Sequence, residues 1–167
     1  MAANRCGAPS GRRSAFEGQS RQMARMTIDE LLARARAGLE RLEPEGALEA
    51  QRHGALLVDV RSDGERARHG VIPGSLHVPR TVLEWRLDPG SPHRNPDACD
   101  LRRHVVVICA DGYSSSLAAA TLQELGYRRA TDLVGGFNAW KSRGLPVAPA
   151  PVADDGPSGM GAVLAVT

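Results

Sequence analysis

The chain has 167 residues, a length typical of one domain with some excess at its ends. Its composition, 42% hydrophobic and 24% charged, matches ordinary globular domains, and no apolar run reaches the roughly 18 residues that a membrane helix needs. The net charge of +2 is too small to indicate nucleic-acid binding, so neither a nucleic acid nor a membrane is expected as a partner.

The cysteines and the first residues suggest where the protein works. There are three cysteines, Cys6, Cys99 and Cys109, an odd number without CxxC spacing, which argues against a disulfide framework and a structural zinc site and favours the cytoplasm. A single lysine among 21 basic residues indicates a GC-rich, bacterial coding bias. The arginine-rich segment 1–25 resembles a transit peptide, but we expect a disordered extension or a misplaced start.

The first elements follow from capping and periodicity. Thr27 with Glu30 forms a capping-box pattern, and apolar residues recur at helical spacing as far as Leu42, which predicts a helix with one apolar face. A second short helix is predicted over 47–52. The nearly continuous apolar run 55–60, "ALLVDV", is typical of a strand buried on both faces of a parallel sheet.

The rest of the chain alternates strands and helices. Ser62 and Glu65 indicate another capped helix, "RTVLEWRL" (80–87) looks helical, and 88–100 is a loop rich in proline and glycine. Further strands are predicted over 75–78, 104–109 and 131–134, and further helices over 115–125 and near 137–143. This order predicts an α/β fold, a central parallel sheet flanked by helices on both faces, in a domain spanning 26–147. The tail 148–167 is expected to be disordered.

Cys109 ends one of these strands, in "VVVICADGYSSSLAAATL" (105–122). It is either a core cysteine or a nucleophile. In parallel sheets, ligands bind where strand ends lead into helices, and Gly112 can take a positive φ that lets backbone N–H groups converge. We expect Ser115 or Ser116 to cap the next helix, whose dipole would lower the thiol pKa. The nucleophile is therefore the favoured interpretation.

Four motifs in order then resemble a known family. They are "LLVDVRSDGE", "HGVIPGSLHVP", "CADGYSS" and "LQELGYRRATDLVGGFNAWKSRGLPV". From about Leu31 to Val147 the chain resembles a single-domain rhodanese, a sulfurtransferase fold. It departs from the family pattern at Val71, where histidine is usual, and at Ser114, where many members have arginine.

The resemblance implies ping-pong sulfur transfer without a metal or organic cofactor. The Cys109 thiolate takes a sulfane sulfur from a small donor as a persulfide, and a thiophilic acceptor removes it: cyanide in an assay, a protein or small thiol in the cell. The loop that would bind the substrate and stabilise the persulfide comprises Ala110, Asp111, Gly112, Tyr113, Ser114 and Ser115. The charge of Asp111 disfavours thiosulfate and leaves persulfides or organic thiols open as donors.

Other residues have structural and functional interpretations side by side. Asp59, Arg61 and Glu65 are expected to fix the loops at the strand ends. Arg86 is either an arginine that reaches over the active loop or a solvated helix residue. Cys99 is either an incidental thiol or a resolving partner for Cys109. The aromatic residues Trp85, Phe137 and Trp140 are expected in the core.

Two alternative functions remain open. The first is a non-catalytic rhodanese module for protein binding or regulation, whose usual mark is loss of the cysteine. The second is a Cys-loop phosphatase or arsenate reductase, whose chemistry usually needs an arginine to clamp the anion. The loop residues 114–116 are all serines and supply none.

Overall fold

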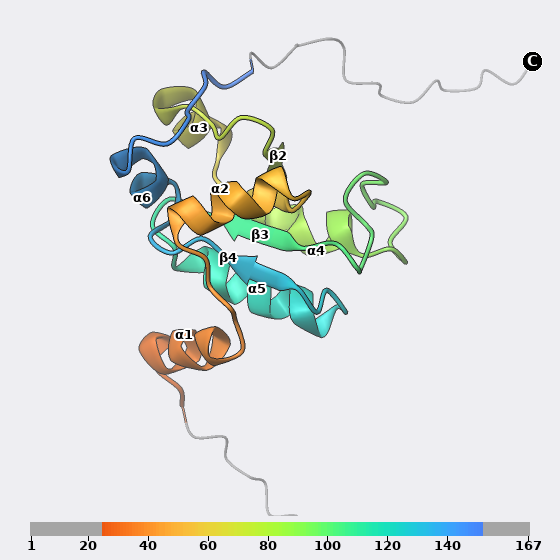
Figure 1. Ribbon diagram of the computed structural model, residues 1–167. Coiled ribbons are helices and arrows are strands. Elements are labelled where there is room, and N and C mark those ends of the chain that lie inside the picture. The colour runs from red at the N-terminus through yellow and green to blue at the C-terminus, as the bar shows by residue number, and fades with distance from the viewer. Residues whose placement is uncertain (1–24, 152–167) are drawn as a thin grey trace, which may run out of the picture.

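The computed structural model describes residues 25–151 (Figure 1). The predicted disordered extension, apart from residue 25, and the predicted tail beyond residue 151 lie outside the described residues. The helices are α1 (Ile28–Ala37), α2 (Pro44–Arg52), α3 (Asp63–His69), the 3-10 turn η1 (Arg80–Val82), α4 (Leu83–Leu87), α5 (Ser114–Glu124) and α6 (Gly136–Ser142). The strands are β1 (Leu56–Asp59), β2 (Leu76–His77), β3 (Val105–Ile108) and β4 (Ala130–Asp132).

The four strands form one parallel sheet in the order β2-β1-β3-β4. The central strands pair in register from Leu56 with Val105 to Asp59 with Ile108, so both end at the same edge of the sheet. Cys109 follows β3 directly at this edge. The predicted α/β class with a parallel sheet is confirmed.

Each face of the sheet packs against its own helices (Figure 1). Because both central strands are buried on both faces, alternate side chains supply two cores. One core joins Val58 and Val107 to residues of α4 and α5, and the other joins Leu57 and Val106 to residues of α2 and α6. The buried aromatic side chains Phe137 and Trp140 lie in the second core, as predicted.

The N-terminal helix is shorter than its apolar spacing predicts. The capping box of Thr27 and Glu30 is present, but α1 ends at Ala37, and Gly38, a poor helix former, follows. The segment beyond it runs beside β4: Leu42 forms a parallel bridge with Leu133. Leu42 therefore continues the edge of the sheet rather than the helix, a non-local pairing that local periodicity does not reveal.

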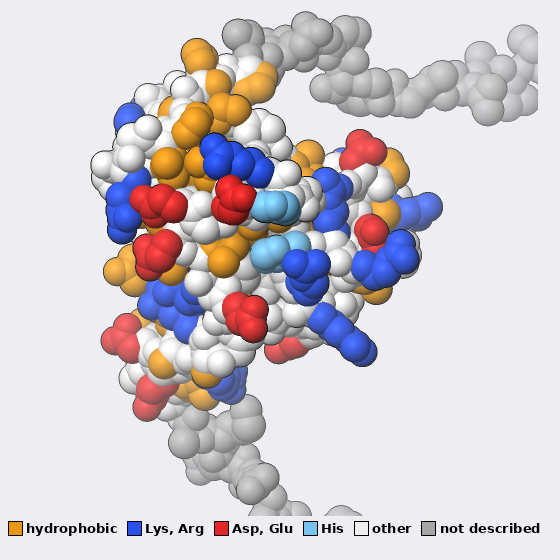
Figure 2. Space-filling view, in the orientation of Figure 1, with side chains coloured by type: hydrophobic (Ala, Val, Ile, Leu, Met, Phe, Trp, Pro, Cys, Tyr) orange, Lys and Arg blue, Asp and Glu red, His pale blue; other side chains and the backbone are white. Residues whose placement is uncertain are grey.

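Trp85 corrects the predicted core. Its side chain is 57% exposed, because α4 buries Leu83 and Leu87, which lie one turn apart on the opposite face of the helix. Acidic and basic side chains are interspersed over the face of the molecule that Figure 2 shows. Helices in the described part of the chain are all too short or too polar to cross a membrane.

The ordered domain also continues past its predicted end at residue 147. Ala148 forms an antiparallel bridge with Val71, in which each backbone N–H donates to the other residue's carbonyl at 2.9 and 2.8 Å. The start of the predicted tail therefore belongs to the folded domain.

Candidate active site

Cys109 lines a hollow at the carboxyl edge of the sheet. The hollow has a volume of about 230 Å³, and its lining residues are Val60, Arg61, Glu65, Cys109, Ala110, Asp111, Tyr113 and Ser114. The cysteine is 7% exposed, so its sulfur is shielded yet forms part of the hollow's wall. A strand end in a parallel sheet thus presents a thiol to a small ligand.

The loop directs hydrogen-bond donors at this sulfur. The Gly112 N–H donates to Cys109 Sγ at 3.1 Å, and the Ser115 hydroxyl oxygen lies 3.2 Å from the same sulfur. Burial raises the pKa of the Cys109 thiol, but hydrogen bonds from the hydroxyls of Ser114 and Ser115 and from loop N–H groups outweigh it and hold the pKa below its ordinary value. The loop therefore favours the thiolate, the nucleophilic form.

Close backbone contacts fix the shape of the loop. Gly112 has a φ of 76°, and a Cβ there would lie 2.7 Å from the Gly135 nitrogen, so only glycine fits. At the start of α6, the N–H groups of Phe137 and Asn138 donate to the carbonyls of Cys109 and Ala110 at 2.8 and 3.0 Å. These contacts turn the carbonyls toward α6 and away from the hollow.

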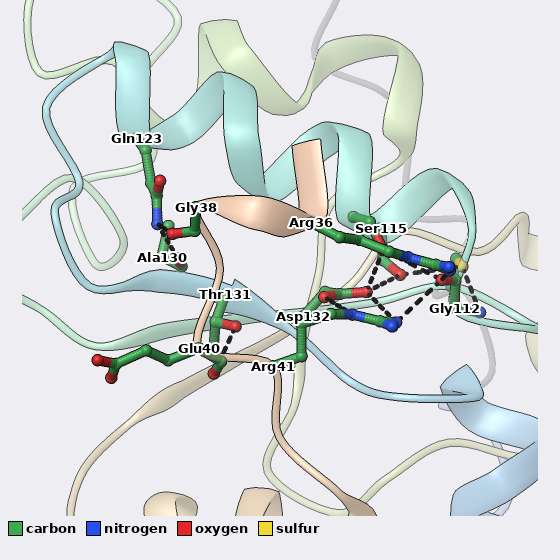
Figure 3. Close-up of polar contacts among 12 residues, drawn as sticks. Arg36, Gly38, Glu40, Arg41, Gly112, Ser115, Gln123, Ala130, Thr131 and Asp132 are labelled. Carbon is green, nitrogen blue, oxygen red and sulfur yellow. Dashed lines mark hydrogen bonds and ion pairs between the residues drawn. The ribbon is translucent and has the colours of Figure 1, made fainter. Parts of the chain in front are cut away.

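A buried polar network lies behind the loop (Figure 3). Ser115 and Ser116 do not cap α5 as predicted: the helix begins at Ser114, and both side chains are fully buried inside its first turn. Their hydroxyls donate to Asp132 Oδ2 at 3.2 and 2.7 Å. Asp132, the last residue of β4, is itself fully buried, so the serines connect the loop to the neighbouring strand instead of satisfying the helix end.

Two arginines from the N-terminal segment complete this network (Figure 3). The Arg41 guanidinium donates from Nε to Asp132 Oδ1 at 2.8 Å and from Nη2 to Oδ2 at 3.1 Å, which makes a bidentate ion pair. Its Nη2 also donates to the Gly112 carbonyl at 3.2 Å, and Arg36 donates to the same carbonyl at 2.7 Å. The back of the loop is therefore cationic, although the loop contains no arginine.

Comparison with known proteins decides the family. The model of the rhodanese-like domain matches residues 43–143. The chain belongs to the rhodanese-like family. A sulfurtransferase of Allochromatium vinosum is 36% identical over 92 residues, which are 55% of this chain and 77% of that protein. The thiosulfate sulfurtransferase GlpE of Stutzerimonas stutzeri is 34% identical over 105 residues, 61% of this chain and 84% of the relative.

A solved structure from Rhodopseudomonas palustris is similar over a longer stretch. It is 34% identical, has a TM-score of 0.69, and covers 76% of this chain and 98% of its own; it is described as a protein of unknown function and a possible tyrosine phosphatase. Together with the family match and the curated relatives, the rhodanese fold makes this protein a sulfurtransferase, and the predictions of family, fold and enzyme class are confirmed.

Of the three predicted supporting residues, Arg61 and Glu65 line the hollow, and Asp59 is the ion-pair partner of Arg61. Arg61 forms a bidentate pair with Asp59 at 3.0 and 2.7 Å, and its guanidinium carbon lies 3.6 Å from the centre of the Phe137 ring. Arg61 also donates to the Gly70 carbonyl at 2.9 Å, so it joins the ends of β1, α3 and α6. Glu65 closes the capping box of α3 with Ser62, and it also lines the hollow.

The remaining loop residues lie at the mouth of the hollow. Asp111 is exposed, and its carboxylate accepts a hydrogen bond from Asn138 at 2.7 Å. Tyr113 is 62% exposed, with the Arg36 guanidinium 5.5 Å from the centre of its ring. The space in front of the sulfur is bordered by Asp111, Tyr113 and Ser114. Glu65 borders it as well, so two carboxylates, those of Asp111 and Glu65, lie at its rim.

Two candidates lie elsewhere in the molecule. Arg86 donates to the His93 carbonyl at 2.9 Å within its own loop region, and it is not among the residues that line the hollow. Cys99 follows Ala98, whose carbonyl binds the Tyr127 hydroxyl beyond the far end of α5. Cys99 is not among the residues that line the hollow, and within the described residues Cys99 and Cys109 are both free cysteines.

Sequence reasoning missed Arg36, Arg41 and Asp132. Asp132 was the easiest of the three to predict. A charged residue at the carboxyl end of a buried strand, next to the strand that ends in the cysteine, itself indicates a site. The two arginines had no such indication. They precede the family motifs, and their approach to the loop depends on the chain turning at Gly38 to run beside β4.

Proposed function

We propose that this sulfurtransferase moves a sulfane sulfur through a persulfide on Cys109. The Cys109 thiolate attacks the sulfane sulfur of the donor; a sulfur–sulfur bond forms, and the rest of the donor leaves with the electron pair of the broken bond. A thiophilic acceptor then attacks the outer sulfur, and the Cys109 thiolate leaves. No proton or redox equivalent is left over, so the loop's role is to stabilise negative charge on sulfur in both steps.

The observation that carries this proposal is the set of donors around Cys109 Sγ. A buried structural cysteine gains nothing from the Gly112 N–H at 3.1 Å and the Ser115 hydroxyl at 3.2 Å, whereas a thiolate or persulfide does. The volume of about 230 Å³ in front of the sulfur suits a small donor or the end of a thiol acceptor. We also propose a cytoplasmic location, which keeps such a thiol reduced.

The charges at the rim support a donor that is not a dianion. Glu65 and Asp111 both border the hollow, while the charge of Arg61 is already paired with Asp59. Two carboxylates in front of the sulfur repel thiosulfate more than a singly charged or neutral sulfane sulfur. We therefore propose a persulfide or organic thiol derivative as the donor and a protein or small thiol as the acceptor.

Phosphatase chemistry is the second candidate, because the similar protein from Rhodopseudomonas palustris is described as a possible tyrosine phosphatase. A phosphate needs guanidinium or backbone donors on several of its oxygens. Here the guanidinium groups of Arg36 and Arg41 reach the loop from behind, on the Gly112 carbonyl, and the rim is acidic. The geometry therefore favours sulfur transfer.

Steady-state assays of four proteins test the proposal. The wild type, Cys6→Ser, Cys99→Ser and Cys109→Ser proteins are each given thiosulfate or glutathione persulfide with cyanide as the acceptor, and thiocyanate is measured. Cys109→Ser is expected to lose all transfer, and the other two variants to keep most of it. Retention of half the sulfur transfer by Cys109→Ser would overturn the assignment. So would a wild type that transfers sulfur from neither donor but hydrolyses an aryl phosphate offered in a parallel assay.

A further inference from the structure

The N-terminal segment reaches the active loop although it lies outside the family match. That match begins at residue 43, whereas α1 ends at Ala37 and packs beside α5 (Figure 1). Arg36, in the last turn of α1, donates through Nη2 to the Gly112 carbonyl at 2.7 Å and through Nε to the Ser116 hydroxyl at 3.1 Å. A residue that precedes the family match therefore touches the loop that holds the nucleophile.

We propose that Arg36 and Arg41 are positioning residues that hold the active loop in its anion-stabilising shape, and that Arg36 supplies the positive charge that the loop itself lacks. The proposal rests on the proposed function, in which the Cys109 thiolate is the nucleophile. It gives Arg36 and Arg41 a role at the active site although both precede the family match.

The geometric part of the argument concerns Gly112. Its carbonyl accepts hydrogen bonds from both arginines at 2.7 and 3.2 Å, while its own N–H donates to Cys109 Sγ at 3.1 Å. The Gly112 N–H and carbonyl belong to the two peptide planes on either side of its Cα, so anchoring the carbonyl limits the φ and ψ rotations by which this glycine, the one loop residue with a positive φ, could turn its N–H away from the sulfur. The two arginines thus keep the Gly112 N–H directed at the sulfur.

The electrostatic part depends on which charges are already paired. The charged side chains around Cys109 are Arg36 from α1, Arg41 from the segment after it, Arg61 and Glu65 from the β1–α3 region, Asp111 from the loop and Asp132 from β4. Arg41 is paired with Asp132, and Asp59 is shared between Arg61 and Arg66 from α3. Within residues 25–151, Arg36 is in no ion pair, so its charge remains available to offset the negative charges at the mouth of the hollow.

The test compares Arg36→Gln with Arg34→Gln in the full-length protein. Arg34 belongs to the same turn of α1 but is exposed and borders the groove between α1 and α5 away from the loop, so the control removes the same charge from the same helix. Alkylation of Cys109 by iodoacetamide is followed against pH by mass spectrometry of its peptide. Alkylation needs no sulfur donor, so the role proposed for Arg36 can fail this test whether or not the protein transfers sulfur.

Arg36→Gln is expected to raise the alkylation midpoint by about half a unit to one unit, which slows alkylation at neutral pH by about three- to tenfold, with Arg34→Gln unchanged. Arg36→Lys keeps the charge but cannot fork between two acceptors, so its midpoint is expected between those of wild type and Arg36→Gln. Equal midpoints for Arg36→Gln and Arg34→Gln would overturn the proposal. If Arg36→Gln does not fold, Arg36→Lys against Arg34→Lys decides it in the same way.

Discussion

Replacing Ser115 by alanine isolates one hydrogen bond to the nucleophile. The Ser115 hydroxyl lies 3.2 Å from Cys109 Sγ and 3.2 Å from Asp132 Oδ2, and the residue is fully buried. The variant removes a single oxygen from the first turn of α5 and leaves the Gly112 N–H on the sulfur. Asp132 keeps its bonds from Arg41 and Ser116, so the network behind the loop stays paired.

The size of the effect follows from the charge on the acceptor. A hydrogen bond to a charged group contributes about 1.5–3 kcal/mol, and the low end applies because the single hydroxyl proton is shared between two acceptors. Since one pKa unit corresponds to about 1.4 kcal/mol, the pKa of Cys109 should rise by about one unit. At a pH below that pKa, the thiolate fraction and the rate of sulfur transfer should fall about tenfold.

The assay is iodoacetamide alkylation of Cys109 against pH, with the rate of sulfur transfer measured over the same range. Thr121→Ala is the matched control, because its hydroxyl lies in the same helix and bonds only the Leu117 carbonyl at 3.1 Å. Both profiles of Ser115→Ala should move to higher pH, and those of Thr121→Ala should not. Coincident profiles for the two variants would refute the view that the Ser115 hydroxyl stabilises the thiolate.

The remaining predictions concern donor charge and stability. Asp111→Asn should raise kcat/KM for thiosulfate several-fold and change it much less for glutathione persulfide, since one rim carboxylate loses its charge; equal effects on both donors would contradict this. Tyr127→Phe should lower the free energy of unfolding in urea by about 1–3 kcal/mol, because the buried hydroxyl that bonds the carbonyls of Leu87 and Ala98 is lost. Burial raises the pKa of Tyr127 to about 12, so this advantage over Tyr127→Phe should be complete below pH 10 and disappear as the pH rises through 12; a difference independent of pH would count against it.

The fold was predictable because its elements are marked locally. The capping boxes at Thr27 and Ser62 and the apolar runs of β1 and β3 appear where the sequence predicts them, and the order of the motifs identified the family. The failures came from pairings distant in sequence. Leu42 has helical spacing but lies beside β4, and Trp85 projects away from the core because Leu83 and Leu87 form the buried face of α4.

The site was predictable only on its near side. Cys109 and Gly112 stand out in the sequence because a glycine, which can take a positive φ, closely follows a cysteine at a strand end. The arginines that contact the back of the loop lie 71 to 80 positions away from their loop partners in the sequence. Serines at a helix start normally suggest caps, whereas the hydroxyls of Ser115 and Ser116 face the buried Asp132 carboxylate and hydrogen-bond to it. This contact between the serines and Asp132 can be predicted only when β4 is known to lie beside β3.

Mass spectrometry of the full-length protein tests the central claim most directly. The protein is incubated with glutathione persulfide or thiosulfate, freed of donor, and measured intact and after digestion without reductant. We predict a gain of about 32 Da, one sulfur atom, on the peptide containing Cys109, and its loss after cyanide is added. A gain only on Cys6 or Cys99, or none with either donor, would contradict sulfur transfer through Cys109.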